Sequence, residues 1–224
     1  MLSKKKIFLV SKPTIWTDEL IKKLSKFDCE YFNDDSYMDN LDQKPDWVFF
    51  FHWSKIVPKK VFEKNRCVVL HVGNLPMGRG GSPIQNQIME GIIESRVNAL
   101  VMGDEIDAGD IYCSLPVTLQ GSLTDIWLTL AHASCLLINQ CVENNPAPKP
   151  QKGTPQVYKR NKDNMLPLVK CDNILDVHRF IQMLDGETYP SAYLKIGKFR
   201  LEFTRSSIST DGVLSDVLIR KIDE

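Results

Sequence analysis

Four short runs made entirely of apolar residues recur in the first half of the sequence, at residues 7–10, 47–51, 67–70 and 99–102. Runs of this length without polar alternation are typical of strands that are buried on both faces of a sheet. Helix-like patterns lie between them, and one begins at Thr17, a predicted N-cap followed by Asp18 and Glu19. We therefore expect an α/β fold with a doubly wound, mostly parallel sheet of the Rossmann-like type, whose ligands bind beyond the carboxyl ends of the strands.

The second half of the sequence predicts a long helix and then a small α+β unit. Ser122 and Asp125 have the spacing of a helix cap, and apolar residues at helical spacing continue to residue 141. Three prolines within residues 144–150 end this helix, so we place a boundary at residue 150, with a catalytic domain at 1–150 and a small domain at 151–224. In the small domain we expect a helix capped by Asp172, a hairpin of residues 192–196 and 199–203, and a third strand at 214–219.

Composition excludes several classes of protein. Lys plus Arg and Asp plus Glu both number 28, so the formal net charge is zero and no global field attracts a nucleic acid or an anionic membrane. No apolar run approaches the roughly twenty residues that span a bilayer, and the basic start lacks a signal-peptide core. The six cysteines contain no C-x-x-C pair, so we expect reduced thiols, no metal site and a cytoplasmic protein without membrane or nucleic-acid partners.

A glycine-rich segment at residues 70–83 follows the third apolar run. It contains four glycines at 73, 78, 80 and 81, so that a ligand can approach its backbone closely, and Ser82 with Pro83 is a typical start of a helix. The segment lacks the G-x-G-x-x-G pattern, and no phosphate-binding G-K-[ST] loop occurs in the chain. Nicotinamide and ATP sites are therefore not predicted.

Two loops at predicted strand ends carry candidate catalytic residues. His71 lies at the end of the third apolar run, and Asp107 lies in the loop that follows the fourth. If both loops share one edge of a parallel sheet, the carboxylate of Asp107 can orient the imidazole and support its protonated form. The alternative is structural, because a strand-end His often satisfies a local hydrogen bond and Asp-x-Gly is a common turn.

These residues also carry a family resemblance. The chain resembles the folate-dependent formyltransferases at five places: His71, the dipeptides 75–76 and 79–80, Pro83 and the run 106–110. The fuller runs 75–86 and 180–190 look most like the branch that formylates amino groups of nucleotide-linked sugars, of the kind that serves pseudaminic-type acids of surface polysaccharides. The resemblance covers residues 45–205, and it implies an N10-formyltetrahydrofolate-dependent sugar N-formyltransferase.

The resemblance implies catalytic roles for three residues. His71 would mediate proton transfer between the attacking amine and the folate nitrogen, and Asp107 would fix its ring. The family usually carries an Asn two residues before its His, where this chain has Val69. The donor for the tetrahedral oxyanion must then be Asn74, His71 as imidazolium, or a backbone amide of the glycine loop. Asn74 could equally be a turn residue.

The resemblance also implies two binding regions. The co-substrate N10-formyltetrahydrofolate is expected to contact Met77, Gly103, Asp104, Glu105 and Ile106. The amino sugar is expected at a set of residues from the other strand ends: Lys12, His52, Trp53, Arg79, Gly80, Gly81 and Ser82. Lys12 and Lys55 could meet phosphate, and Trp53 could stack on a base or simply pack. Arg79 would face the pocket or brace a carboxylate such as Asp110.

Other functions remain open from the sequence. The acceptor could be methionyl-tRNA, although the mixed charges of the C-terminal segment argue against a tRNA-binding face. Water as the acceptor would make the chain a formyltetrahydrofolate hydrolase, and loss of the Asn could indicate a folate- or nucleotide-binding protein without turnover. The exposed edge of the predicted hairpin suggests a homodimer.

Overall fold

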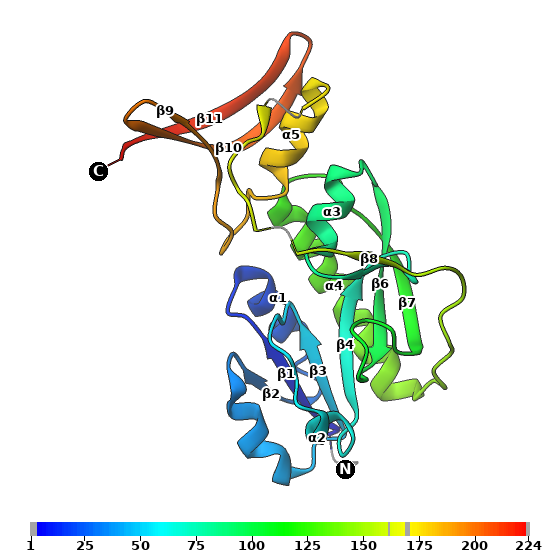
Figure 1. Ribbon diagram of the computed structural model, residues 1–224. Coiled ribbons are helices and arrows are strands. Elements are labelled where there is room, and N and C mark those ends of the chain that lie inside the picture. The colour runs from blue at the N-terminus through cyan, green and yellow to red at the C-terminus, as the bar shows by residue number, and fades with distance from the viewer. Residues whose placement is uncertain (1–3, 161, 169–170, 223–224) are drawn as a thin grey trace.

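A six-stranded sheet forms the centre of the molecule in the computed structural model, which describes residues 4–160, 162–168 and 171–222 (Figure 1). Its strand order is β2-β1-β3-β4-β6-β7. The strands are β1 (Lys6–Ser11), β2 (Asp28–Phe32), β3 (Trp47–Phe51), β4 (Cys67–Val72), β6 (Glu94–Val101) and β7 (Ile111–Thr118). The first four are parallel, whereas β6 is antiparallel to β4 and β7 is antiparallel to β6. The expected mostly parallel α/β sheet is confirmed, with an antiparallel pair at one edge.

Alternation along the strands divides the core into two layers. Residues such as Leu9, Phe49 and Leu70 pack toward α1 (Ile15–Lys23) and α4 (Leu123–Asn144) on one face of the sheet. Phe8 and Phe50 point to the other face, where the 3-10 helix η1 (Asp35–Gln43) and the short helix α2 (Lys59–Phe62) contribute buried residues. The candidate site lies on this second face, where Phe50, Val69 and His71 line a cavity.

The helix caps confirm one sequence prediction and correct two. Ser122 and Asp125 form the expected capping box of α4, with N–H···O distances of 3.1 Å and 3.0 Å. The N-cap of α1 is Thr14, not Thr17, because the Thr14 hydroxyl accepts from the Thr17 amide. Asn173 likewise replaces Asp172 as the cap of α5 (Ile174–Gln182), since its side chain accepts from the Asp176 amide.

The glycine-rich segment contains a short strand that the sequence did not predict. This strand, β5 (Met77–Gly80), pairs in parallel with β8 (Gln156–Tyr158) and leads into α3 (Pro83–Met89). The predicted boundary at residue 150 therefore precedes a strand that pairs with the first domain. The pairing fixes the chain between residues 151 and 160 beside the candidate site.

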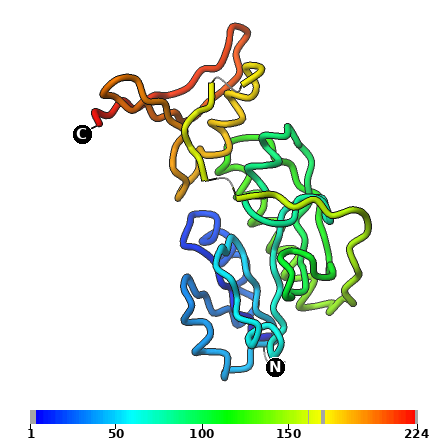
Figure 2. The backbone as a smooth tube through the Cα atoms, in the orientation of Figure 1, coloured from blue at the N-terminus to red at the C-terminus, as the bar shows by residue number. Residues whose placement is uncertain are grey.

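The C-terminal residues form the predicted antiparallel sheet at the end of the molecule opposite β1–β3 (Figure 2). Its strands are β9 (Ala192–Ile196), β10 (Phe199–Ser209) and β11 (Gly212–Lys221), and α5 packs against β10 and β11. All six cysteines carry free thiols. Within the described ranges, no helix is long and apolar enough to cross a membrane.

Candidate active site

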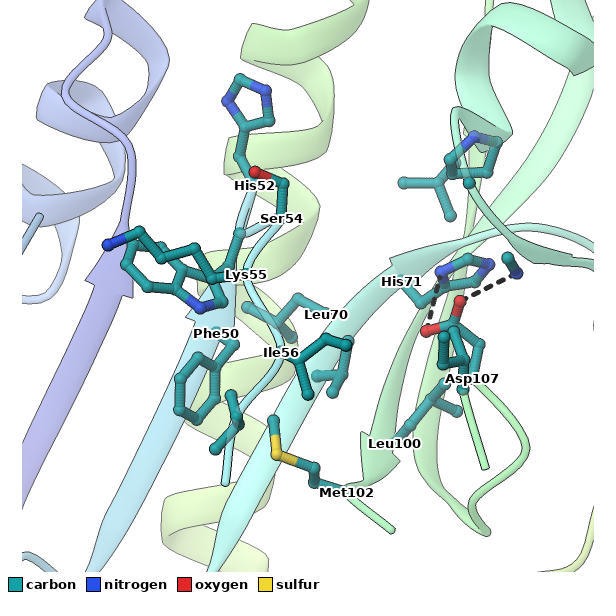
Figure 3. A pocket seen from close by; sticks show the side chains of 18 of the residues that line it. Phe50, His52, Ser54, Lys55, Ile56, Leu70, His71, Leu100, Met102 and Asp107 are labelled. Atoms are coloured by element: carbon teal, nitrogen blue, oxygen red, sulfur yellow. Dashed lines mark hydrogen bonds and ion pairs between the residues drawn. The ribbon is translucent and has the colours of Figure 1, made fainter. Parts of the chain in front are cut away.

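His71 and Asp107 are in contact, as the sequence predicted, and both are mostly buried. The Nδ1 atom of His71 lies 3.3 Å from Oδ1 of Asp107, and the His71 ring is 6% exposed (Figure 3). The Nε2 atom lies 2.8 Å from the carbonyl oxygen of Gly78. Both ring nitrogens thus face acceptor oxygens, and only the imidazolium form can donate to both.

The expected reason for this contact is wrong. In the antiparallel pair of β4 and β6, Val68 lies opposite Val101, so the loop after β6 begins at the other edge of the sheet from the end of β4. The two loops therefore do not share a carboxyl edge. Residues 102–110 instead fold back along the sheet and bring Asp107 to His71.

Several hydrogen bonds hold this returning loop in place. The Gln151 side-chain amide donates to the carbonyl oxygens of Asp107 and Gly109 at 2.8 Å and 2.9 Å. The Gly80 amide donates to Oδ2 of Asp107 at 2.9 Å, so both carboxylate oxygens are engaged. Asp107 itself has a left-handed backbone, with a φ of 54°. A non-glycine residue rarely adopts this conformation unless its surroundings impose it.

Arg79 stabilises the loop and is absent from the residues that line the cavity. Its Nε and Nη2 atoms donate to the Gln151 side-chain oxygen at 3.0 Å and 2.9 Å, and its Nη1 atom lies 3.4 Å from Glu105. Arg79 therefore does not face the cavity in which the acceptor is expected. Arg79 braces Gln151, and through it Asp107, rather than Asp110.

A cavity of about 940 Å³ opens beside His71, at the upper end of the range for ligand pockets. Most of the predicted site residues line it: Lys12, His52, Trp53, His71, Gly80, Gly81, Ser82, Gly103, Asp104, Glu105, Ile106 and Asp107. Asn74 and Met77 do not. The Asn74 amide donates to the Glu94 carbonyl oxygen, and Met77 is half exposed on β5, because the segment after β4 turns them away.

One end of the cavity is apolar. Phe50, Leu100 and Met102 line it in Figure 3, together with Val69, which lies two residues before His71 on β4. An apolar cavity wall of this kind suits a flat aromatic ring system. The valine supplies no hydrogen-bond donor where the family usually has an amide.

His52 lies at the opposite end of the cavity in an aromatic cluster. Its Nδ1 accepts from Nε1 of Trp16 at 3.2 Å, and its ring packs on Trp127 with centroids 4.1 Å apart. Burial, with a smaller effect from Lys12, lowers the pKa of His52 to about 3. His52 is therefore neutral at pH 7, where it forms part of the wall and does not carry a proton for catalysis.

This low pKa predicts that acid destabilises the fold. The unfolded chain takes up a proton at His52 near pH 6.5, whereas the folded chain does so only near pH 3. Between these values the unfolded state binds more protons, so the free energy of unfolding falls as pH falls, by about 1 kcal/mol per pH unit. Urea unfolding at pH 5, 6 and 7 measures this dependence of the free energy of unfolding on pH.

The slope of the free energy of unfolding against pH should decrease in His52→Gln. It should persist in His132→Gln, which changes an exposed histidine. Equal slopes in wild type and His52→Gln would contradict the low pKa of His52.

The sequence prediction missed two polar residues that build the site. Gln151 follows a proline-rich segment and showed no motif. Asn98 lies directly opposite His71 on β6, is 1% exposed, and donates to the Gly73 carbonyl oxygen at 2.8 Å. An amide directly before the apolar run at residues 99–102 was the available signal for Asn98, because a buried polar group must find partners.

Comparisons with known proteins agree on one family. Residues 162–220 match the family model described as methionyl-tRNA formyltransferase, C-terminal domain. A solved structure, methionyl-tRNA formyltransferase from Clostridium thermocellum, is 31% identical with a TM-score of 0.89, and the match covers 96% of this chain and 99% of that one. The methionyl-tRNA formyltransferase of Helicobacter acinonychis is 28% identical over 160 residues, which cover 68% of this chain and 50% of the relative. The chain thus spans about half the length of that curated relative.

These relatives correct two sequence-based expectations. The expected nucleotide-sugar acceptor, with its role in polysaccharide synthesis, is contradicted, because the relatives with the higher identities are named for methionyl-tRNA. A sugar N-formyltransferase from Shewanella has a TM-score of 0.64 at 15% identity, covers 98% of this chain and 99% of that one, and shows the fold alone. The same names contradict the expectation of no nucleic-acid partner. Net charge misled because it averages over the whole chain and carries no information on the charge of any one surface.

Proposed function

Because this chain belongs to the formyltransferase family, we propose that it transfers the formyl group of N10-formyltetrahydrofolate to the amino group of methionyl-tRNA. The observation that carries the proposal is the buried His71–Asp107 pair in the wall of a large cavity. N10-formyltetrahydrofolate is the formyl donor that the family uses, as the resemblance implied. The apolar end of the cavity, near Phe50 and Met102, suits the flat pterin ring.

The reaction requires proton transfer and stabilisation of negative charge. The neutral amine attacks the formyl carbon and a tetrahedral oxyanion forms. The new ammonium loses a proton and the folate N10 gains one; the oxyanion then collapses to the amide carbonyl as the bond between carbon and N10 breaks, and tetrahydrofolate leaves. His71 would serve both needs, exchanging its hydrogen bond to Gly78 for one to the reacting group. Asp107 would hold the ring and balance its positive charge.

The hydrogen bonds of the glycine loop narrow the choice of oxyanion donor. Asn74 lies outside the cavity lining, and Val69 has no donor. The backbone amides of Gly73, Gly80 and Gly81 already donate to the Arg96 carbonyl, the Asp107 carboxylate and the Tyr158 carbonyl respectively. His71 lines the cavity, and we propose its imidazolium as the donor for the oxyanion.

A formyl-transfer assay tests this function directly. The purified chain is incubated with N10-formyltetrahydrofolate and methionyl-tRNA, and formylmethionine is measured after hydrolysis of the ester. We expect formylation of methionyl-tRNA, and no consumption of the donor with uncharged tRNA, which lacks the amine. Donor consumption without any amine would identify a hydrolase instead, and no consumption with methionyl-tRNA would refute the proposal.

A further inference from the structure

The positively charged side chains that line the cavity fall into two groups. Lys55 pairs with Asp35 at 2.6 Å, and Lys59 pairs with Asp104 at 2.7 Å. Lys12 and Arg160 also line the cavity, but neither has an acidic partner within the described part of the chain. The cavity therefore contains two cations whose charge the protein does not neutralise.

The carboxylates that line the cavity are already engaged elsewhere. Asp104 pairs with Lys59, Glu105 lies 3.4 Å from Arg79, and Asp107 contacts His71 and the Gly80 amide. None of these interactions involves Lys12 or Arg160. The two free cations are thus available to a ligand.

The fold holds Lys12 and Arg160 near one another. Lys12 follows β1, and its carbonyl oxygen accepts from the Thr17 hydroxyl at 2.8 Å. Arg160 follows β8 and lies against Gly81, where an added Cβ would come within 2.8 Å of the Arg160 Cβ. Burial lowers the pKa of Lys12, and repulsion from Arg160 lowers it further. Two like charges held together this way are stabilised by a bound anion.

Two buried N–H donors that face the Tyr189 hydroxyl extend this end of the cavity. Gln85 is 5% exposed, and neither its Nε2 nor the Nε1 of Trp127 makes a hydrogen bond of normal geometry; the Tyr189 hydroxyl is the acceptor nearest to both. Both side chains line the cavity near the hydroxyl group of Tyr189. Because their contact with Tyr189 is poorly aligned, a ligand oxygen could replace that hydroxyl as their acceptor.

We propose that Lys12 and Arg160 form a subsite for a phosphate group of the acceptor. This inference rests on the proposed function: in methionyl-tRNA, the phosphodiester on the 5′ side of the terminal adenosine is the phosphate nearest to the amine. The lysine ammonium attracts such a group as a single positive charge, and the arginine guanidinium can donate two parallel hydrogen bonds to its oxygens. Gln85 and Trp127 would then donate to the oxygens of the same terminal nucleotide.

Kinetics of charge-removing variants test the subsite within the reaction. In Lys12→Met and in Arg160→Gln, the KM for methionyl-tRNA should rise roughly tenfold, with kcat and the KM for N10-formyltetrahydrofolate unchanged. Each variant should also reduce the slope of log KM against log salt concentration by about one. Lys12→Arg, which keeps the charge, should restore most of the affinity. Lys26→Met is the control, because Lys26 is paired with Glu143 and lies outside the residues that line the cavity, and its KM should stay within twofold of wild type.

The glutamate carboxylates of the folate tail are another candidate ligand for these two cations. The same kinetic data distinguish them from the phosphate of the acceptor. If the KM for N10-formyltetrahydrofolate rises while the KM for methionyl-tRNA does not, the cations bind the glutamate carboxylates and the proposal is wrong. Unchanged values for both substrates would also overturn it.

Binding of adenosine 5′-monophosphate tests the subsite without the reaction. Calorimetry should show that the wild type binds this nucleotide more tightly than adenosine, and that the Lys12→Met, Arg160→Gln double variant loses the difference. This result in a chain that fails to formylate methionyl-tRNA would support the subsite and refute only the proposed function. Equal binding of the nucleotide and adenosine by the wild type would refute the subsite.

Discussion

Replacing Asp107 with asparagine should lower kcat about a hundredfold or more while the fold persists. One oxygen of the carboxylate faces Nδ1 of His71 and the other accepts from the Gly80 amide. An asparagine side chain has only one oxygen, so its NH₂ group must face either the imidazolium or a backbone donor. The variant therefore loses both the charge that balances protonated His71 and the orientation of its ring. Single-turnover kinetics at saturating substrates measures the loss.

Comparison with His71 and with a neighbouring carboxylate makes this experiment specific. His71→Asn should cost a similar factor, and the double variant should cost little more than either single change, because the two residues act as a unit. Asp110→Asn introduces the same chemical change in the same loop, at a side chain outside the residues that line the cavity. Its kcat should stay within twofold of wild type. Full activity in Asp107→Asn would remove the carboxylate from the mechanism.

The sequence predicted the parts of the fold that depend on local pattern. The four apolar runs lie in strands of the central sheet, apart from Met102, which follows β6, because a strand buried on both faces leaves a continuous apolar signal. The capping box of α4 and the C-terminal hairpin are equally local and are confirmed. The His71–Asp107 contact was predicted from position at strand ends together with a family resemblance.

Strand direction and long-range partners could not be predicted in the same way. An apolar run does not encode whether β6 is parallel or antiparallel to β4, so the path that brings Asp107 to His71 was misjudged. The partly exposed strands β2 and β7 show weaker apolar patterns and were missed. Gln151 is separated from the residues it holds by more than forty positions, and only the folded chain reveals its role.

Gly109→Ala should inactivate the chain almost as fully as the loss of Asp107, although residue 109 carries no side chain for chemistry. A Cβ at this position would lie 1.8 Å from the Val101 carbonyl oxygen, a backbone atom that cannot move aside cheaply. The returning loop would have to shift away from β6. The shift would strain the bonds from Gln151 to the carbonyl oxygens of Asp107 and Gly109 and move the carboxylate away from His71.

The expected signature separates a displaced loop from general unfolding. In Gly109→Ala, kcat should fall about a hundredfold, while the free energy of unfolding falls by only about 1–3 kcal/mol, the usual cost of overpacking. Gly103→Ala adds the same methyl group to the same loop, where it meets no atom within 4 Å, so its free energy of unfolding should equal that of the wild type. Adding Asp107→Asn to Gly109→Ala should reduce kcat little further, because the glycine acts by placing that carboxylate. A Gly109→Ala variant with wild-type kcat would show that catalysis does not require the loop in this position.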